Sequence, residues 1–214
     1  MTAAQPESPV FGGVRSLEVR WIFPGQLETA VAGWFERFPA AMEAREDTYL
    51  LDPDLRGLSV KVRGGGALEV KVYRGSPEIL EVAGRARGRM ESWHKWSFPF
   101  TAPGPGSGDR VGWRVVSKRR RISRFSLASG QIQVSVPGPG KEPGCEVELT
   151  EVRTGGEAWW TLGFEATGPA SLLRSELRAA AALVFDQALP GGVEPGIDDS
   201  RSYAQWLCRL PGAE

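Results

Sequence analysis

The chain has 214 residues, and its 26 Lys and Arg side chains equal its 26 Asp and Glu side chains in number. Zero net charge argues against non-specific binding to nucleic acids or anionic membranes, which depends on excess positive charge. The single histidine excludes any metal site that needs two histidines, and two cysteines are too few for a disulfide framework.

The overall composition favours a folded protein that is rich in turns. Hydrophobic residues make up 41% of the chain, and 27 Gly and 16 Pro residues favour strands over long helices. Residues 1–13 are polar and predict a flexible tail, whereas residues 14–210 predict a single domain. The sequence shows neither a basic and apolar leader nor a run of 18 apolar residues, so we expect a cytoplasmic protein without a membrane partner.

In chain order, apolar and polar residues first alternate over residues 14–23, which predicts a half-buried strand. Apolar residues at helical spacing predict a short amphipathic helix at 26–38. A short strand at 48–51 follows, and then strands at 58–63 and 67–73 are joined by a hairpin loop of three glycines.

The second half of the chain again reads mainly as strands. A further strand is expected at 78–82, a short aromatic segment at 91–100, and a long strand with a following hairpin partner over 113–136. Alternation predicts two more strands at 145–152 and 158–166. Helices are then expected at 169–189 and at 199–208, the latter with Asp199 or Ser200 as its N-cap.

Several of these strands share one pattern, an apolar face opposite a charged face. The charged faces together carry seven basic and five acidic residues: Arg20, Lys61, Arg63, Lys71, Arg114, Lys118 and Arg120, with Glu18, Glu69, Glu146, Glu148 and Glu165. One interpretation is an open sheet with its polar face in water. The other is a closed barrel with the charged face inside and helices against the apolar outside.

A charged interior would be costly unless its charges pair, stay hydrated or hold an ionic ligand. Mixed signs suit a polyphosphate with a metal, because Lys and Arg bind phosphate oxygens while carboxylates hold Mg²⁺ or Mn²⁺. A lipocalin-like carrier of an apolar ligand would instead need the charged face outside.

The order of these strands resembles the CYTH, or triphosphate tunnel metalloenzyme, superfamily over residues 14–208. Its Glu-x-Glu-x-Lys opening strand resembles residues 16–20, where Ser16 replaces the first Glu and Arg20 replaces the Lys. Its basic strands resemble residues 58–63, 68–71 and 118–120, and its carboxylate strands resemble residues 145–148 and 161–165. The ending at 202–207 is similar to the family's terminal Ser-Tyr-x-x-Leu-Leu helix.

The resemblance implies an α+β fold that is mainly antiparallel, with about eight strands closed into a tunnel and flanked by helices. It also implies a metal-dependent triphosphatase that takes a small triphosphate or polyphosphate ligand, as a monomer or homodimer. Ser16 and Gly163 stand where carboxylates are expected, so the chain would be a divergent member. The alternative is a degraded relative that binds a phosphate ligand, or acts as a scaffold, without catalysis.

The resemblance also implies roles for individual residues. The substrate-binding residues would be Arg20, Lys61, Arg63, Lys71, Arg114, Lys118 and Arg120. The ligands of Mg²⁺ or Mn²⁺ would be Glu18, Glu146, Glu148 and Glu165. The catalytic residues would be Glu18, Glu148 and Lys71.

Three other features have simpler interpretations than a site. His94 lies between Trp93 and Trp96 and is read as a partly buried structural residue rather than a general base. Cys145 has no neighbouring histidine in sequence and is read as a packed thiol. The basic run at 118–121 would be split between the two faces of a strand, which argues against a nucleic-acid patch.

Overall fold

The computed structural model describes residues 13–52, 54–55, 57–64, 66–82, 84–99, 112–128, 130–138 and 143–210. The predicted tail lies outside these residues except for Gly13. The described elements run in the order β1 (Val14–Pro24), α1 (Thr29–Phe35), β2 (Ala41–Leu50), β3 (Leu58–Arg63), β4 (Ala67–Val82), β5 (Ala86–Pro99), β6 (Trp113–Ala128), β7 (Gln131–Ser135), β8 (Gly144–Thr154), β9 (Glu157–Thr167), α2 (Leu173–Val184), the 3₁₀ turn η1 (Pro190–Gly192) and α3 (Tyr203–Leu207).

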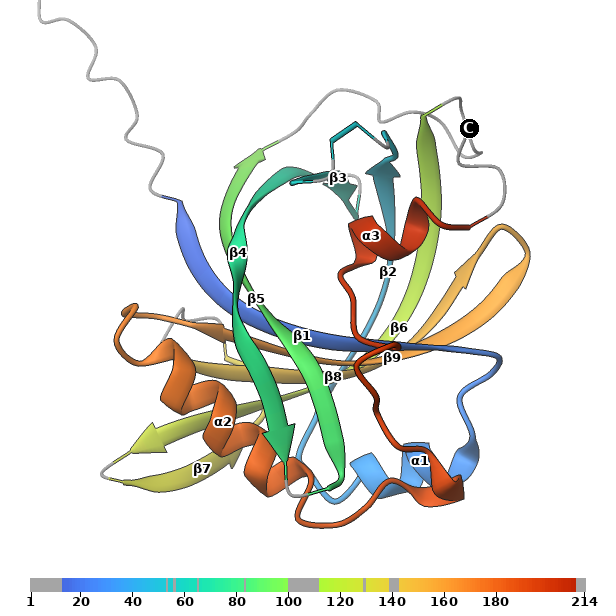
Figure 1. Ribbon diagram of the computed structural model, residues 1–214. Helices are drawn as coiled ribbons and strands as arrows, with labels where there is room; N and C mark the ends of the chain where they lie inside the picture. The colour runs from blue at the N-terminus through green and yellow to red at the C-terminus, as the bar shows by residue number, and fades with distance from the viewer. Residues whose placement is uncertain are drawn as a thin grey trace, which may run out of the picture.

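The strands form a closed antiparallel barrel (Figure 1). Neighbouring strands follow the order β2-β3-β4-β5-β1-β9-β8-β6, and a further pairing of β2 with β6 closes the ring of eight. Strand β7 pairs with the far end of β6 as an extension of the wall. The predicted barrel of about eight strands with flanking helices is therefore confirmed, and the open sheet is not formed.

Several elements are longer than the sequence predicted. Strand β2 spans ten residues where only 48–51 was expected, and β5 spans fourteen where a short aromatic segment was expected. Residues 67–82 form one strand with a register shift around Gly75, instead of two separate strands. Alternation is hidden in β2 because its outward face mixes apolar residues such as Met42 with the polar residues Glu46 and Thr48.

The helices, by contrast, begin later than their apolar spacing predicted. Glu28 precedes α1 with an extended backbone, and Ser202 does the same before α3. The side chain of Ser202 accepts a hydrogen bond from the backbone N–H of Gln205 at 3.3 Å, so Ser202 is the N-cap rather than Asp199 or Ser200. None of the helices in the described part of the chain is long and apolar enough to cross a membrane.

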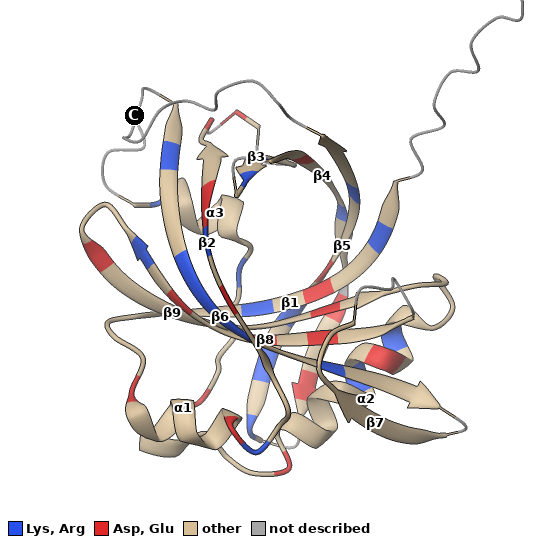
Figure 2. Ribbon diagram, turned by 180° about the vertical axis from the view of Figure 1, so that it is seen from behind, with Lys and Arg blue, Asp and Glu red and all other residues tan. Residues whose placement is uncertain are grey.

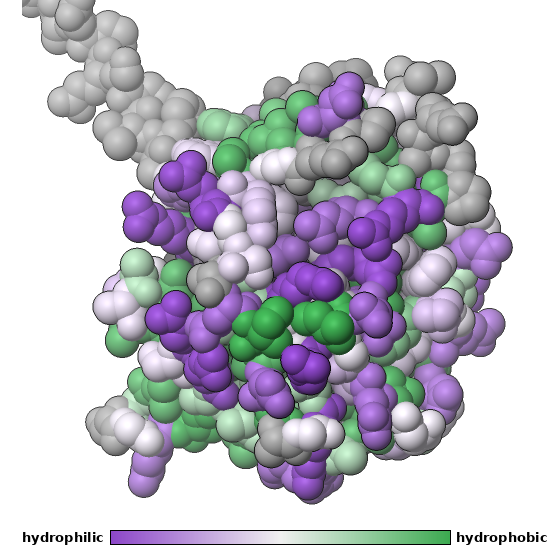
Figure 3. All heavy atoms as spheres, in the orientation of Figure 1, coloured by the Kyte–Doolittle hydropathy of each residue, from purple (hydrophilic) through white to green (hydrophobic). Residues whose placement is uncertain are grey.

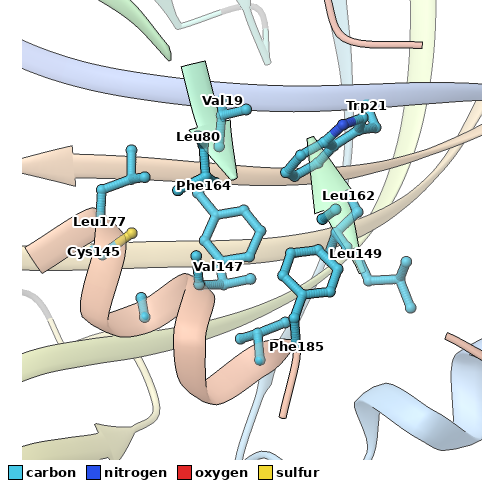
Figure 4. Close-up of a cluster of buried hydrophobic side chains, with 14 of the residues drawn as sticks. Val19, Trp21, Leu80, Cys145, Val147, Leu149, Leu162, Phe164, Leu177 and Phe185 are labelled. Atoms are coloured by element: carbon cyan, nitrogen blue, oxygen red, sulfur yellow. The ribbon is translucent and has the colours of Figure 1, made fainter. Parts of the chain in front are cut away.

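The main hydrophobic core lies outside the barrel, between its wall and helices α1 and α2 (Figure 4). Alternation along β1 directs Val19 and Trp21 outward, where Trp21 meets Phe164 and Phe185 edge to face at centroid distances of 6.0 and 5.7 Å. Helix α2 contributes Leu177, which is fully buried. Because the apolar residues of the strands face the helices, the charged residues of the same strands face the barrel interior.

A second, smaller apolar cluster fills one end of the barrel. Trp206 and Leu207 of α3 pack there against Ile22, Val116 and Val152, which face inward from β1, β6 and β8. Helix α3 accordingly lies at one opening of the barrel (Figure 1). The charged part of the interior begins beyond this apolar plug.

The contribution of α2 to stability can be measured by a matched pair of substitutions. We expect Leu177→Ala to lower the free energy of unfolding by about 2–5 kcal/mol, because it leaves a cavity under α2. Leu172→Ala, at a side chain that is 42% exposed, should change it by less than about 0.5 kcal/mol. Urea unfolding measures both, and equal effects would contradict the packing of α2 on the barrel.

Candidate functional site

The barrel interior holds a charged cavity of about 80 Å³. Lysine, arginine, aspartate and glutamate residues recur along the strands that surround it (Figure 2). Eight basic side chains line the cavity: Arg20, Arg45, Lys61, Lys71, Arg89, Lys118, Arg120 and Arg201. Four acidic side chains line it: Glu18, Glu91, Glu148 and Glu165. The lining therefore carries more positive than negative charge, which favours an anionic ligand.

A row of carboxylates crosses four neighbouring strands at one level of the barrel. Register places Glu91 of β5 beside Glu18 of β1, Glu18 beside Glu165 of β9, and Glu165 beside Glu146 of β8. Lys71 separates these charges, with its Nζ 2.7 Å from Glu18 and 3.8 Å from Glu165. At the edge of the row, burial and the nearby Glu165 raise the pKa of Glu146.

Lys95 is the second lysine of this row and lies on β5. Its Nζ is 2.9 Å from Glu165, whose carboxylate raises the pKa of Lys95 above its ordinary value. Burial alone would raise the pKa of Glu165, but the ammonium groups of Lys71 and Lys95 outweigh it and hold that pKa low. The two central carboxylates of the row, Glu18 and Glu165, are therefore held by lysines.

The next level of the barrel is built around Glu148. Its Oε1 is 2.6 Å from Nη1 of Arg20, and its Oε2 accepts a hydrogen bond from Nε of Arg120 at 2.8 Å. Burial would raise the pKa of Glu148, yet Arg120 and Arg20 hold it well below its usual range. In return, Glu148 keeps the pKa of Arg20 raised although burial alone would lower it. Glu148 and its two arginine partners are therefore all charged.

A third cluster surrounds Asp47, which is fully buried. Its carboxylate oxygens lie 2.9 Å from Nζ of Lys118, 3.2 Å from Nζ of Lys61 and 3.1 Å from Nε of Arg45. These cations outweigh burial and lower the pKa of Asp47. Burial lowers the pKa of Lys118 well below its ordinary value, and its Nζ also donates to the Tyr49 hydroxyl at 2.7 Å. Three cations thus share one buried carboxylate.

Most of the residues expected to bind or act on a ligand are brought together by the fold. The cavity lining includes Glu18, Arg20, Lys61, Lys71, Lys118, Arg120, Glu148 and Glu165. Arg63 lies apart with a side chain that is 40% exposed, where its Nη1 is 3.0 Å from Glu69. Glu146, 3.8 Å from Arg124, and the buried Arg114 are also outside the lining.

The sequence interpretation missed several residues of the site. Arg45 and Asp47 lie on the unrecognised part of β2, and Lys95 lies on the unrecognised part of β5. Tyr203 of α3 reaches the cavity. The centroid of its ring lies 3.9 Å from Nζ of Lys118 and 4.7 Å from the guanidinium carbon of Arg20. Alternation of charged residues at 43, 45 and 47 is the signal that could have located the β2 members.

The carboxylates predicted to bind Mg²⁺ or Mn²⁺ are engaged by basic side chains. Glu148 pairs with two arginines, Glu18 pairs with Lys71, and Glu165 pairs with Lys71 and Lys95. Across the described residues, no group of three or more His, Cys, Asp or Glu side chains is arranged to hold a metal ion. The side chains in this arrangement therefore do not fit a protein-held divalent cation, which needs several free oxygen ligands.

The other residues singled out from the sequence lie outside the cavity. The ring of His94 faces the ring of Trp96 at a centroid distance of 4.4 Å. Cys145 is a buried free thiol whose pKa is raised by burial. Arg119 and Arg121 point away from the interior and lie 3.8 and 3.2 Å from Glu151.

A second, larger cavity of about 750 Å³ adjoins the first at the end of the barrel that carries α3. Arg89, Arg201 and Ala204 border both cavities, so the two lie next to each other. Its remaining walls combine apolar side chains such as Leu58 and Val60 with polar groups of α3 and the preceding segment. The face of the molecule that carries α3 is mostly hydrophilic, with a small apolar group near its middle (Figure 3).

No family model and no curated protein sequence matches this chain. Among solved structures, it is similar to a conserved hypothetical protein from Pyrococcus furiosus, with 16% identity, a TM-score of 0.42, and coverage of 88% of this chain and 98% of that one.

Two further similar structures are triphosphatases. The S. pombe Pct1 RNA triphosphatase, in complex with the Spt5 CTD, has 10% identity, a TM-score of 0.41, and coverage of 82% and 80%. The Mimivirus capping enzyme triphosphatase has 11% identity, a TM-score of 0.39, and coverage of 80% and 90%. Likenesses of this strength assign no function to this chain.

The ion pairs of the interior should be visible in the acid stability of the protein. Lys61 and Arg63 outweigh burial and lower the pKa of Glu69 to about 2 from an ordinary 4.5. The stabilisation from this carboxylate is therefore present above pH 4.5 and is lost as the pH falls towards 2. We expect Glu69→Gln to be destabilised at pH 6, and the deficit to shrink by about 2 kcal/mol at pH 3.

Urea unfolding of both proteins at the two pH values measures this change. Glu81→Gln provides the control, because the Glu81 side chain is 65% exposed and its pair with Arg87 is open to solvent. A Glu69→Gln deficit that stays constant between pH 6 and pH 3 would show that Glu69 is not held ionised by its partners.

Proposed function

We propose that the barrel interior binds the phosphate chain of a triphosphate or polyphosphate compound. The observation that carries the proposal is the excess of basic over acidic side chains around one partly enclosed cavity, eight against four. Guanidinium and ammonium groups form strong charge-assisted hydrogen bonds with phosphate oxygens, and a partly enclosed cavity strengthens them. Inorganic or organic compounds with several linked phosphates present enough oxygens to engage several such groups together.

The ion pairs around the cavity support this function. Lys71, Lys118 and Arg120 are each held by a carboxylate on another strand of the barrel, so their positions are fixed before a ligand arrives. Pairing also removes the cost of leaving a buried cation without a partner. Ammonium and guanidinium groups have more than one donor, and the donors not used by carboxylates are available to phosphate oxygens.

Of the two activities left open by the sequence, the geometry favours binding over hydrolysis. Phosphoryl transfer to water needs a neutralised phosphate chain and a positioned, activated water molecule. The basic side chains supply the first requirement. Of the carboxylates that would supply the second, Glu148 has both oxygens against arginines, and Oε1 of Glu18 is shared by Lys71 and Ser16, which leaves few oxygen atoms for a water molecule.

The neighbouring cavity of about 750 Å³ guides the choice of ligands for testing. This volume lies in the range of small-molecule sites, and its walls mix apolar and polar groups. A compound whose phosphates lie in the tunnel could place an organic group there. A test panel should therefore contain inorganic tripolyphosphate and a nucleoside triphosphate such as ATP.

Calorimetric titration of the full chain with tripolyphosphate and with ATP tests binding directly. We expect Lys71→Met to weaken binding about tenfold or more, because a charge-assisted hydrogen bond contributes about 1.5–3 kcal/mol. Arg87→Met is the control, since Arg87 has a side chain that is 60% exposed and lies outside the cavity lining. No binding to the wild-type protein, or equal affinities for both variants, would overturn the proposal.

A phosphate-release assay with the same ligands, in Mg²⁺ and in Mn²⁺, separates binding from hydrolysis. We expect no release by the wild-type protein above that of Glu148→Gln and Glu18→Gln. Release that disappears in both variants would identify the protein as a metal-dependent triphosphatase and would overturn binding as its sole activity.

A further inference from the structure

Arg20 crosses a neighbouring strand to reach its partner. Register aligns Arg20 of β1 with Gly163 of β9, and aligns Gly163 with Glu148 of β8. Arg20 and Glu148 therefore lie one full strand apart, yet Nη1 of Arg20 is 2.6 Å from Oε1 of Glu148. The arginine side chain spans the strand at the position where β9 has no side chain.

Gly163 is required for space rather than for backbone conformation. A Cβ atom at this position would lie 2.6 Å from Cζ of Arg20 and 2.7 Å from each of its Nη atoms. Contacts that short do not occur, so any other residue would displace the guanidinium. Gly163 is not one of the glycines with a positive φ, and its backbone would accept any residue.

The guanidinium is fixed from several directions inside the cavity. Besides the pair with Glu148, Nη1 of Arg20 donates a hydrogen bond to Oγ1 of Thr161 at 2.9 Å, and the ring of Tyr203 lies 4.7 Å from Cζ. Only 13% of the side chain is exposed. The result is a positive charge that is fixed beside a carboxylate of the wall and borders the cavity.

Ser16, the other position that lacks an expected carboxylate, supports the same pattern. Its hydroxyl donates a hydrogen bond to Oε1 of Glu18 at 2.5 Å, and the same oxygen is 2.7 Å from Nζ of Lys71. Both substituted positions therefore help to hold a carboxylate against a basic side chain. Neither adds a carboxylate ligand for a metal.

We propose that the Arg20 guanidinium, seated over Gly163 and held by Glu148, takes the place of a divalent cation, so that the tunnel binds phosphate chains without added metal. This inference rests on the proposed function, because it assumes that the tunnel binds a phosphate chain. It assigns Arg20 to direct contact with the ligand and assigns Gly163 to the positioning of Arg20.

The decisive experiment is calorimetric titration of the full wild-type chain with tripolyphosphate, once in excess EDTA and once with Mg²⁺. We expect binding in EDTA that is no weaker than binding with Mg²⁺. Binding only with Mg²⁺ would overturn the inference and leave the proposed function standing. Absence of binding under both conditions would instead overturn the proposed function.

Variants then test the role of the guanidinium under the EDTA condition. We expect Arg20→Gln to weaken binding about tenfold or more, and Gly163→Ala to weaken it as well by displacing Arg20. Gly33→Ala is the matched control, because a Cβ there would meet no atom within 4 Å. Circular dichroism verifies folding, and wild-type affinity in a folded Arg20→Gln variant would overturn the inference.

Discussion

The structure depends on compensation of the charges that the strands direct into the barrel. A buried charge costs several kcal/mol unless an opposite charge lies beside it. Here the partners come from other strands of the barrel: Lys71 of β4 pairs with Glu18 of β1 across β5, and Arg120 of β6 pairs with Glu148 of the adjacent β8. The same pairs that make the interior stable also fix the basic side chains around one cavity. Fold and candidate function thus have a common physical cause.

Much of the barrel could be predicted because alternation is a property of each strand alone. The apolar outer face and charged inner face of β1 are both visible in the sequence, and this placed Glu18 and Arg20 on one side. Strand β2 was mostly missed because its outer face mixes apolar residues with Glu46 and Thr48. The sequence also could not show which acid meets which base, since Asp47 and Lys118 are 71 residues apart in the chain.

Gly163 illustrates the difference between a residue's identity and its role. In the sequence it marks a carboxylate that the resemblance led us to expect. In the folded chain its lack of a side chain leaves the space that the Arg20 side chain needs to reach Glu148. The change is therefore linked to a basic side chain, and it shifts the balance of the cavity towards positive charge. That balance favours retention of an anion over the metal-assisted chemistry of a site rich in free carboxylates.

The most direct measurement is a crystal structure of the full chain grown with tripolyphosphate and without added metal. We expect the phosphate groups to lie in the barrel cavity, in contact with Lys71, Lys118 and Arg20. Phosphate bound only on the outer surface, or a crystal with an empty cavity at saturating tripolyphosphate, would contradict a phosphate-binding tunnel.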